Sequence, residues 1–246
     1  MNRSDARYGM ILDRGLTFEQ LDLAYHLAVA DPDPRTNRRR LTISLRDLVN
    51  DQEAQGKTKK CLTRVWLNPP AAAAEMIAWA RANGQTIEPR VLHMGALLAT
   101  FPFVGVVAKV IGQHLQTESQ IEAPRAREEV RRILGDRSSV DVGARKAYTT
   151  LCNLGLLQRV GRTLMPMNEL IVVSDPLVVA WLSNAVLLTR QVESQPVSSL
   201  RSAPELLGAT MVAVASTAYP LLETHANGGE RVVAATRSAV GAAAIS

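Results

Sequence analysis

Residues 138–167 read SSVDVGARKAYTTLCNLGLLQRVGRTLMPM. Up to about Leu154 the apolar side chains fall within about 40° of one direction on a helix that turns by about 100° per residue. These apolar positions are Val140, Ala144, Ala147, Leu151 and Leu154. The opposite face carries polar side chains and the small apolar Val142, and its polar members are Arg145, Lys146, Thr149 and Asn153. The pattern predicts an amphipathic helix capped by Ser138 or Ser139.

The second half of this stretch predicts a β-hairpin. Gly155 is suited to the left-handed conformation that ends many helices. Residues 156–160 form an apolar run of strand type, Gly161 and Arg162 can make a tight turn, and residues 163–167 can return as a second strand.

Two further helices precede this unit. Residues 91–115 predict a long apolar helix that is interrupted near Pro102, because proline removes a backbone donor and clashes with the preceding turn. A short strand at 120–123 follows, and Pro124 then opens a helix that Gly135 closes.

This order of elements resembles a winged helix-turn-helix domain over residues 89–170. The resemblance is carried by AYTTLCNLGLLQRVGR at 147–162, and above all by its L-x-x-L-G-L-L pattern. It implies that the helix at 139–154 enters the major groove of DNA and that the hairpin at 156–167 touches the adjacent backbone. The wider chain also resembles an uncharacterised family of bacterial proteins with an internal winged helix, through RVWL at 64–67, FPF at 101–103 and LGLL at 154–157. No activity follows from that wider likeness.

The resemblance assigns DNA-contacting roles to several side chains. The candidate groove contacts are Arg145, Lys146, Thr149 and Asn153, the candidate wing contacts are Arg159 and Arg162, and the candidate phosphate contacts at the helix start are Arg137, Ser138 and Ser139. Two departures weaken the match: the hairpin turn is short, and Asp136 and Asp141 place negative charge at the end expected to face DNA. The alternative is a winged helix used for protein contact, with Arg145 and Lys146 merely solvated.

The charge distribution agrees with a polyanionic partner. The chain has 28 Lys and Arg against 23 Asp and Glu, and we count a net charge of +3 over residues 1–70, −1 over 71–88, +5 over 89–167 and −2 over 168–246. A localised positive excess favours binding to polyanions. A second phosphate-contacting surface is predicted at Arg38, Arg39, Arg40, Lys57, Lys59 and Lys60, with a solvated loop as the alternative.

The basic N-terminal region, residues 1–88, is expected to be helical. A helix at 16–30 is predicted from Thr17 and Gln20, which have the spacing of a capping box. Ser44 can cap a helix that runs to about Ala54, Gly56 is expected to stop it, and the following lysines are then expected to lie in a basic turn. A further helix is predicted at 71–83.

The C-terminal region, residues 171–246, is expected to be helical as well. We predict helices at 176–189 and 204–219, a linker at 193–199 and a frayed tail after Asn227. The exposed apolar faces of these helices leave open either a homodimer or a complex with a protein partner.

Known catalytic, metal and membrane patterns are not found in the sequence. Cys61 and Cys152 have no ligand spacing, the four histidines are scattered, and phosphate-loop, dinucleotide and nucleophile-elbow motifs are lacking. The apolar stretches at 91–111, 171–189 and 206–222 are interpreted as buried helices rather than membrane spans. We expect no metal, no cofactor, no membrane and no enzymatic activity, and a cytoplasmic location because no secretory signal is visible.

The sequence thus predicts a mainly α-helical protein with a central winged helix-turn-helix of three helices plus a short β-hairpin. Its expected function is binding of double-stranded DNA, as a regulator. The alternative is a helical adaptor or interaction subunit of a multicomponent bacterial system.

Overall fold

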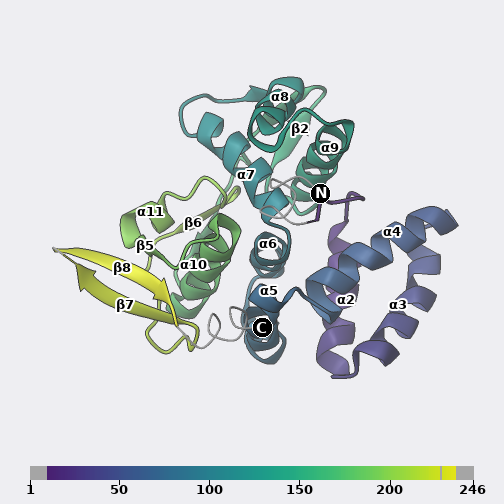
Figure 1. Ribbon diagram of the computed structural model, residues 1–246, viewed down its shortest axis with the longest axis horizontal. Coiled ribbons are helices and arrows are strands. Elements are labelled where there is room, and N and C mark those ends of the chain that lie inside the picture. The colour runs from purple at the N-terminus through teal and green to yellow at the C-terminus, as the bar shows by residue number, and fades with distance from the viewer. Residues whose placement is uncertain (1–9, 228, 237–246) are drawn as a thin grey trace.

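The computed structural model describes residues 10–227 and 229–236, which are mainly α-helical (Figure 1). One group of helices comes from the N-terminal region and comprises α2 (Phe18–Ala30), α3 (Pro34–Leu48), α4 (Gln52–Leu62) and the π-helical turn η1 (Thr63–Leu67). The predicted capping box of α2 is confirmed, because the Thr17 hydroxyl accepts from the Gln20 amide and the Gln20 side chain accepts from the Thr17 amide.

The predicted helix from Ser44 to Ala54 is wrong. Asp33 caps α3, and Pro34 occupies the first helical position, so this helix begins ten residues earlier and ends at Leu48. Its successor α4 passes through Gly56, since a glycine inside a helix costs only about 1 kcal/mol relative to alanine. As a result, the three lysines at 57, 59 and 60 lie on a helix rather than in a turn.

The middle of the chain contains α5 (Ala71–Asn83), the 3-10 turn η2 (Gly84–Thr86), α6 (Pro89–Thr100) and α7 (Pro102–Leu115). The predicted helix at 71–83 is confirmed. The predicted interruption near Pro102 is confirmed as well, because the chain bends by 115° between α6 and α7.

Two helices and a small sheet follow α7. The elements in chain order are β1 (Ile121–Glu122), α8 (Ala123–Leu134), α9 (Ser138–Asn153), β2 (Gln158–Val160) and β3 (Thr163–Met165). The three strands form an antiparallel sheet in the order β1-β3-β2. The turns at Gly135 and Gly155 have φ angles of 97° and 65°, as the predicted helix ends require. The predicted serine cap of α9 is wrong, because Arg137 occupies the cap position and no side chain caps the helix.

The C-terminal region is mixed rather than helical. Its elements are β4 (Ile171–Val173), α10 (Pro176–Arg190), β5 (Ser194–Pro196), α11 (Val197–Arg201), β6 (Ala209–Met211), β7 (Leu222–Asn227) and β8 (Glu230–Ala235). The parallel pair β4–β6 forms one sheet, and β5-β8-β7 forms an antiparallel one.

The helix predicted at 176–189 is confirmed, whereas the helix at 204–219 and the linker at 193–199 are wrong. Gly208 has a φ of 73° and lies against the Leu156 backbone, so the chain turns there into β6 instead of continuing as a helix. The tail predicted to fray after Asn227 contains β8, and the rest of that prediction lies outside the described residues.

Buried apolar residues from all three regions form one hydrophobic cluster. In Figure 1, α6 and α7 run through the middle, with α2–α4 on one side, α10 and the C-terminal strands on the other, and α8, α9 and β2 at the top. Gly95 of α6 lies against the indole of Trp181 of α10, where a larger residue would clash. Within the described part of the chain, no single helix is long and apolar enough to cross a membrane, and only the bent pair α6 and α7 qualifies together.

Candidate nucleic-acid interface

One side of α9 is covered by the extended segment that precedes α2. The Leu16 amide donates to the Thr150 hydroxyl over 2.9 Å, and the Asn153 side chain donates to the Leu16 carbonyl over 2.8 Å. A Cβ atom at Gly15 would lie 3.3 Å from the Thr149 methyl group. Residues 11–16, which we call the cover segment, therefore occupy the flank of α9 that holds two of the predicted groove contacts.

The rest of the polar face of α9 is open. Ser138, Ser139 and Arg145 are exposed, and Val142 keeps 44% of its surface accessible. Within the described residues, the Arg145 side chain forms no ion pair. These residues form the open stripe of α9.

Cations from distant segments gather beside the open stripe. Burial lowers the pKa of Lys146, and the positive charges of Arg145, Arg14 and Lys57 lower it further. The four side chains Arg14, Lys57, Arg145 and Lys146, which we call the cationic cluster, thus come from the cover segment, α4 and α9. Arg14 was not predicted as a site residue, because its proximity to α9 depends on contacts across more than 130 residues of sequence.

Carboxylates pair with one lysine of the cluster, Lys57, and with its neighbour Lys60 on α4. Lys57 pairs with Glu53 at 2.6 Å, and Lys60 pairs with Asp13 at 3.3 Å. Both lysines are at least half exposed, so these pairs are open to water and contribute little binding of their own.

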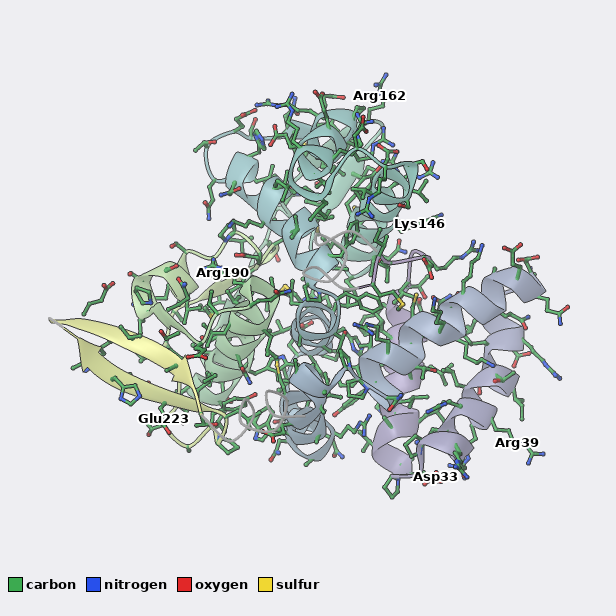
Figure 2. All side chains as sticks on the ribbon, viewed as in Figure 1. Asp33, Arg39, Lys146, Arg162, Arg190 and Glu223 are labelled. Atoms are coloured by element: carbon green, nitrogen blue, oxygen red, sulfur yellow. The ribbon has the colours of Figure 1, made fainter. Side chains whose placement is uncertain are left out.

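The β2–β3 hairpin places its two arginines differently. The Arg159 Nε donates to the Gly161 carbonyl over 3.0 Å, and its guanidinium lies 5.7 Å from the centre of the Tyr148 ring on α9. Arg162 is exposed at the turn and extends outward at the top of the molecule in Figure 2. Its carbonyl accepts from the Ala123 amide over 2.8 Å, which fixes the turn to the start of α8.

Asp136 and Asp141, the two acids that depart from the winged-helix pattern, form ion pairs with arginines of α8. Asp136 lies 3.3 Å from Arg131, and Asp141 lies 3.3 Å from Arg127. Arg137 is half-buried and donates to the Leu134 carbonyl over 3.3 Å. The negative charge at this end of α9 is therefore balanced within the fold.

The predicted second basic surface is divided. Arg38, Arg39 and Arg40 are exposed on α3, and Arg40 pairs with Asp31 at 3.5 Å. Figure 2 places Arg39 near the lower end of α3, far from Lys146. Lys57 belongs to the cationic cluster, while Lys59 lines a groove between α3 and α4. The arginine run and the open stripe thus do not form one continuous patch.

Comparison of the chain with protein-family models, curated proteins and solved structures finds no match. Among residues 10–227 and 229–236, no group of three or more His, Cys, Asp or Glu side chains could hold a metal ion.

Proposed function

We propose that residues 89–170 form a winged helix that binds double-stranded DNA, with α9 in the major groove and the β2–β3 hairpin on the adjacent backbone. The order α7, β1, α8, α9, β2, β3 supports this proposal, because winged helices share the sequence helix, strand, helix, helix, hairpin. The pairing of β1 with β3 is a further shared feature.

The observation that carries the proposal is the open stripe of α9 with cations beside it. Arg14, Lys57 and Lys146 join Arg145 of the stripe in the cationic cluster, and the Arg159 guanidinium of the hairpin lies over the Tyr148 ring of α9. Phosphate contacts by such neighbouring cations position a protein on DNA, whereas contacts to base edges specify the sequence. Arg145 is suited to guanine and Val142 to the thymine methyl group.

The proposal limits base reading to one part of α9. Asn153 already donates to the Leu16 carbonyl, and Thr149 packs against Gly15. We therefore assign the base contacts to Val142 and Arg145, and assign Ser138 and Lys146 to phosphate.

A fluorescence-anisotropy titration of the full chain with random duplex DNA tests the proposal. The double variant Arg145→Ala, Lys146→Ala is expected to weaken binding about tenfold or more, and to reduce the slope of log affinity against log salt by about 1, because Lys146 is the residue of the pair that contacts phosphate. Arg201→Ala, Arg231→Ala is the matched control, since it removes the same charge from exposed positions on α11 and β8, which carry no assigned DNA contact. An equal loss in the control, or unchanged affinity in the first variant, contradicts the proposal.

An adaptor function is the second candidate, and one apolar patch favours it. Val172 on β4 is 62% exposed and Val212, which follows β6, is 53% exposed. The Val212 amide donates to the Val173 carbonyl over 3.1 Å, so the two segments are held side by side. Under this alternative, Val172→Asp, Val212→Asp abolishes a protein complex in co-purification, while loss of Arg145 and Lys146 leaves that complex intact.

A further inference from the structure

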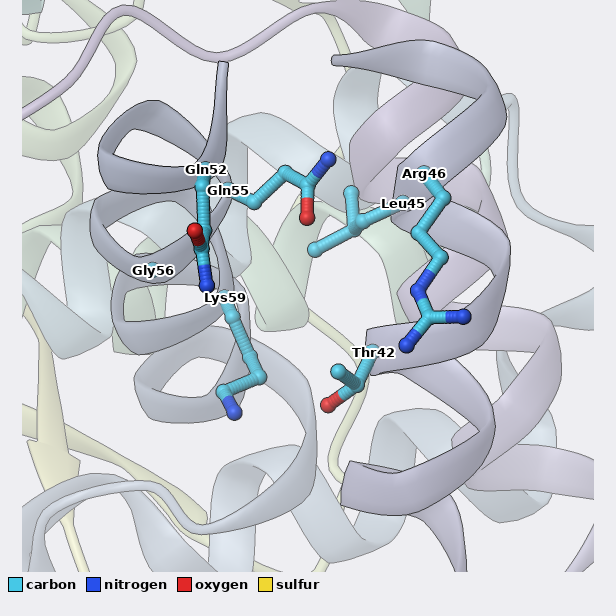
Figure 3. A pocket seen from close by; sticks show the side chains of 7 residues that line it. All are labelled: Thr42, Leu45, Arg46, Gln52, Gln55, Gly56 and Lys59. Atoms are coloured by element: carbon cyan, nitrogen blue, oxygen red, sulfur yellow. The ribbon is translucent and has the colours of Figure 1, made fainter. Parts of the chain in front are cut away.

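A groove of about 460 Å³ lies between α3 and α4, away from the open stripe of α9 (Figure 3). Its lining residues are Thr42, Leu45, Arg46, Gln52, Gln55, Gly56 and Lys59. None of them is acidic, although Asp and Glu occur elsewhere on both helices.

The groove is held open by the connection between its two helices. The Val49 amide donates to the Leu45 carbonyl over 2.9 Å, and the Asp51 carboxylate accepts from the Ala54 amide over 2.6 Å, so each helix end is fixed. The Gln55 side chain donates to the Val49 carbonyl over 2.7 Å and ties α4 to the turn.

Bare backbone forms part of the α4 wall. A Cβ atom added to Gly56 would meet no heavy atom within 4 Å. A ligand can therefore approach the α4 backbone more closely at Gly56 than at a residue that carries a side chain.

Two cations face this space from opposite walls. Figure 3 shows the guanidinium of Arg46 on α3 and the ammonium of Lys59 on α4 on either side of the groove. Within the described part of the chain, neither side chain has an ion pair or a hydrogen bond, and the Gln52 amide has no partner either. Thr42 donates its hydroxyl proton to the Arg38 carbonyl over 2.7 Å, so it supplies no donor to a ligand.

We propose that this groove is a binding site for a phosphate group. A phosphate monoester carries a charge of about −1.5 to −2 at pH 7, which matches the two opposed cations better than the single charge of a carboxylate. The planar guanidinium of Arg46 can donate two parallel hydrogen bonds to phosphate oxygens, and the Lys59 ammonium supplies a compact positive charge. The Gln52 amide supplies a further donor, and the bare backbone at Gly56 leaves room for the ligand.

The phosphate can come from a small molecule, as a monoester with this charge, or from a nucleic-acid backbone, where each phosphodiester carries one negative charge and matches the two cations less closely. The site itself does not depend on DNA binding by α9, because it uses none of the residues assigned to the α9 interface, although α4 also carries Lys57 of the cationic cluster. Its test therefore uses inorganic pyrophosphate as the probe.

The experiment is a titration of the ¹⁵N-labelled full chain with sodium pyrophosphate, at an ionic strength held constant with sodium chloride. We expect saturable shifts of the Gly56 and Lys59 amide signals. Arg46→Gln, Lys59→Gln is expected to weaken binding at least about tenfold, because both phosphate contacts are lost. Arg201→Gln, Arg231→Gln removes the same charge from exposed positions on α11 and β8, outside the groove, and is expected to change the affinity by less than about twofold.

A third variant tests whether binding needs the open space of the groove in addition to its two cations. Gly56→Met keeps both cations and fills the groove, and it replaces a poor helix former with a better one, so the fold is retained. We expect the pyrophosphate affinity to fall, as measured on the Lys59 signal. No saturable shift in the parent chain, equal losses in the two double variants, or full affinity in Gly56→Met would each overturn the proposal.

Adding duplex DNA to the same titration distinguishes the two sources. If DNA prevents the pyrophosphate shift, the groove takes a backbone phosphate. If the shift persists with DNA present, or if the chain binds no DNA, the groove takes the phosphate of a small molecule. If the chain binds pyrophosphate but not DNA, the result supports this site and contradicts the proposed function.

Discussion

At the residue scale, His93 is an unusual titratable group, because it is buried among aromatic rings. Its side chain is fully buried on α6, with the rings of Phe18, Tyr25 and Trp66 between 5.6 and 6.2 Å away. The nearest carboxylate oxygen, on Asp22, lies 3.5 Å from Nε2. Burial lowers the pKa of His93 to about 4, against the opposing effects of the Asp22 and Glu88 charges.

This burial predicts a loss of stability in mild acid. The folded protein keeps His93 neutral down to about pH 4, whereas the unfolded chain takes up a proton near pH 6.5, so the unfolded state binds more protons between these values. The contribution is present above pH 6.5 and is lost as the pH falls toward 4. At pH 5 the loss amounts to at most about 2 kcal/mol.

Urea unfolding at pH 7.5 and pH 5 measures this loss. His93→Phe is expected to flatten the dependence of the unfolding free energy on pH, whereas the exposed His225→Gln is expected to leave it unchanged. An undiminished slope in His93→Phe would show that other groups cause the acid sensitivity.

At the element scale, local signals were sufficient for some boundaries and misleading for others. The capping box at Thr17 and the glycines at 135 and 155 act within a few residues, so the sequence alone predicts those ends. The Asp31-Pro-Asp-Pro34 run ends α2 and also begins α3, and the start of α3 at this run was not predicted.

Elements that depend on distant partners were not predictable. The pairing of β4 with β6 joins residues 171 and 209, and no short pattern specifies it. For the candidate site, the exposure of Arg145 and Arg162 follows from periodicity and turn type. The position of Arg14 beside Lys146 and the groove beside Arg46 required the tertiary structure.

The start of α3 gives a second prediction at this scale. The Asp33 carboxylate accepts from the Arg35 and Thr36 amides over 3.1 and 3.0 Å. Asp33→Ala is expected to lower the unfolding free energy by about 1 kcal/mol, whereas Asp33→Asn keeps an acceptor at the cap and is expected to retain most of the stability. Thermal and urea unfolding of both variants would measure the difference, and equal losses would mean that the charge, not the cap, matters.

At the scale of the whole molecule, the segment around Glu205, which follows α11, is joined to the end of α10 by a buried ion pair. Arg190 at the end of α10 makes two hydrogen bonds of 2.9 Å to Glu205, whose side chain is fully buried. The same guanidinium also donates to Ser199 over 3.0 Å and to Gln195 over 3.4 Å. The irregular segment around Glu205 includes Pro204, whose backbone packs against Gly112 of α7, so the pair connects regions far apart in sequence.

Breaking this pair is expected to destabilise the molecule strongly. Glu205→Ala leaves the buried guanidinium without its counter-charge, which costs about 3–5 kcal/mol in comparable sites, whereas Glu53→Ala removes an exposed partner and costs less than about 1 kcal/mol. The combined change Arg190→Met, Glu205→Leu removes both charges and is expected to recover much of the loss, because the desolvation cost disappears together with the attraction. Urea unfolding of the three variants measures these differences. A Glu205→Ala variant as stable as Glu53→Ala would mean that water already solvates Arg190 and that apolar packing alone holds the segment around Glu205 in place.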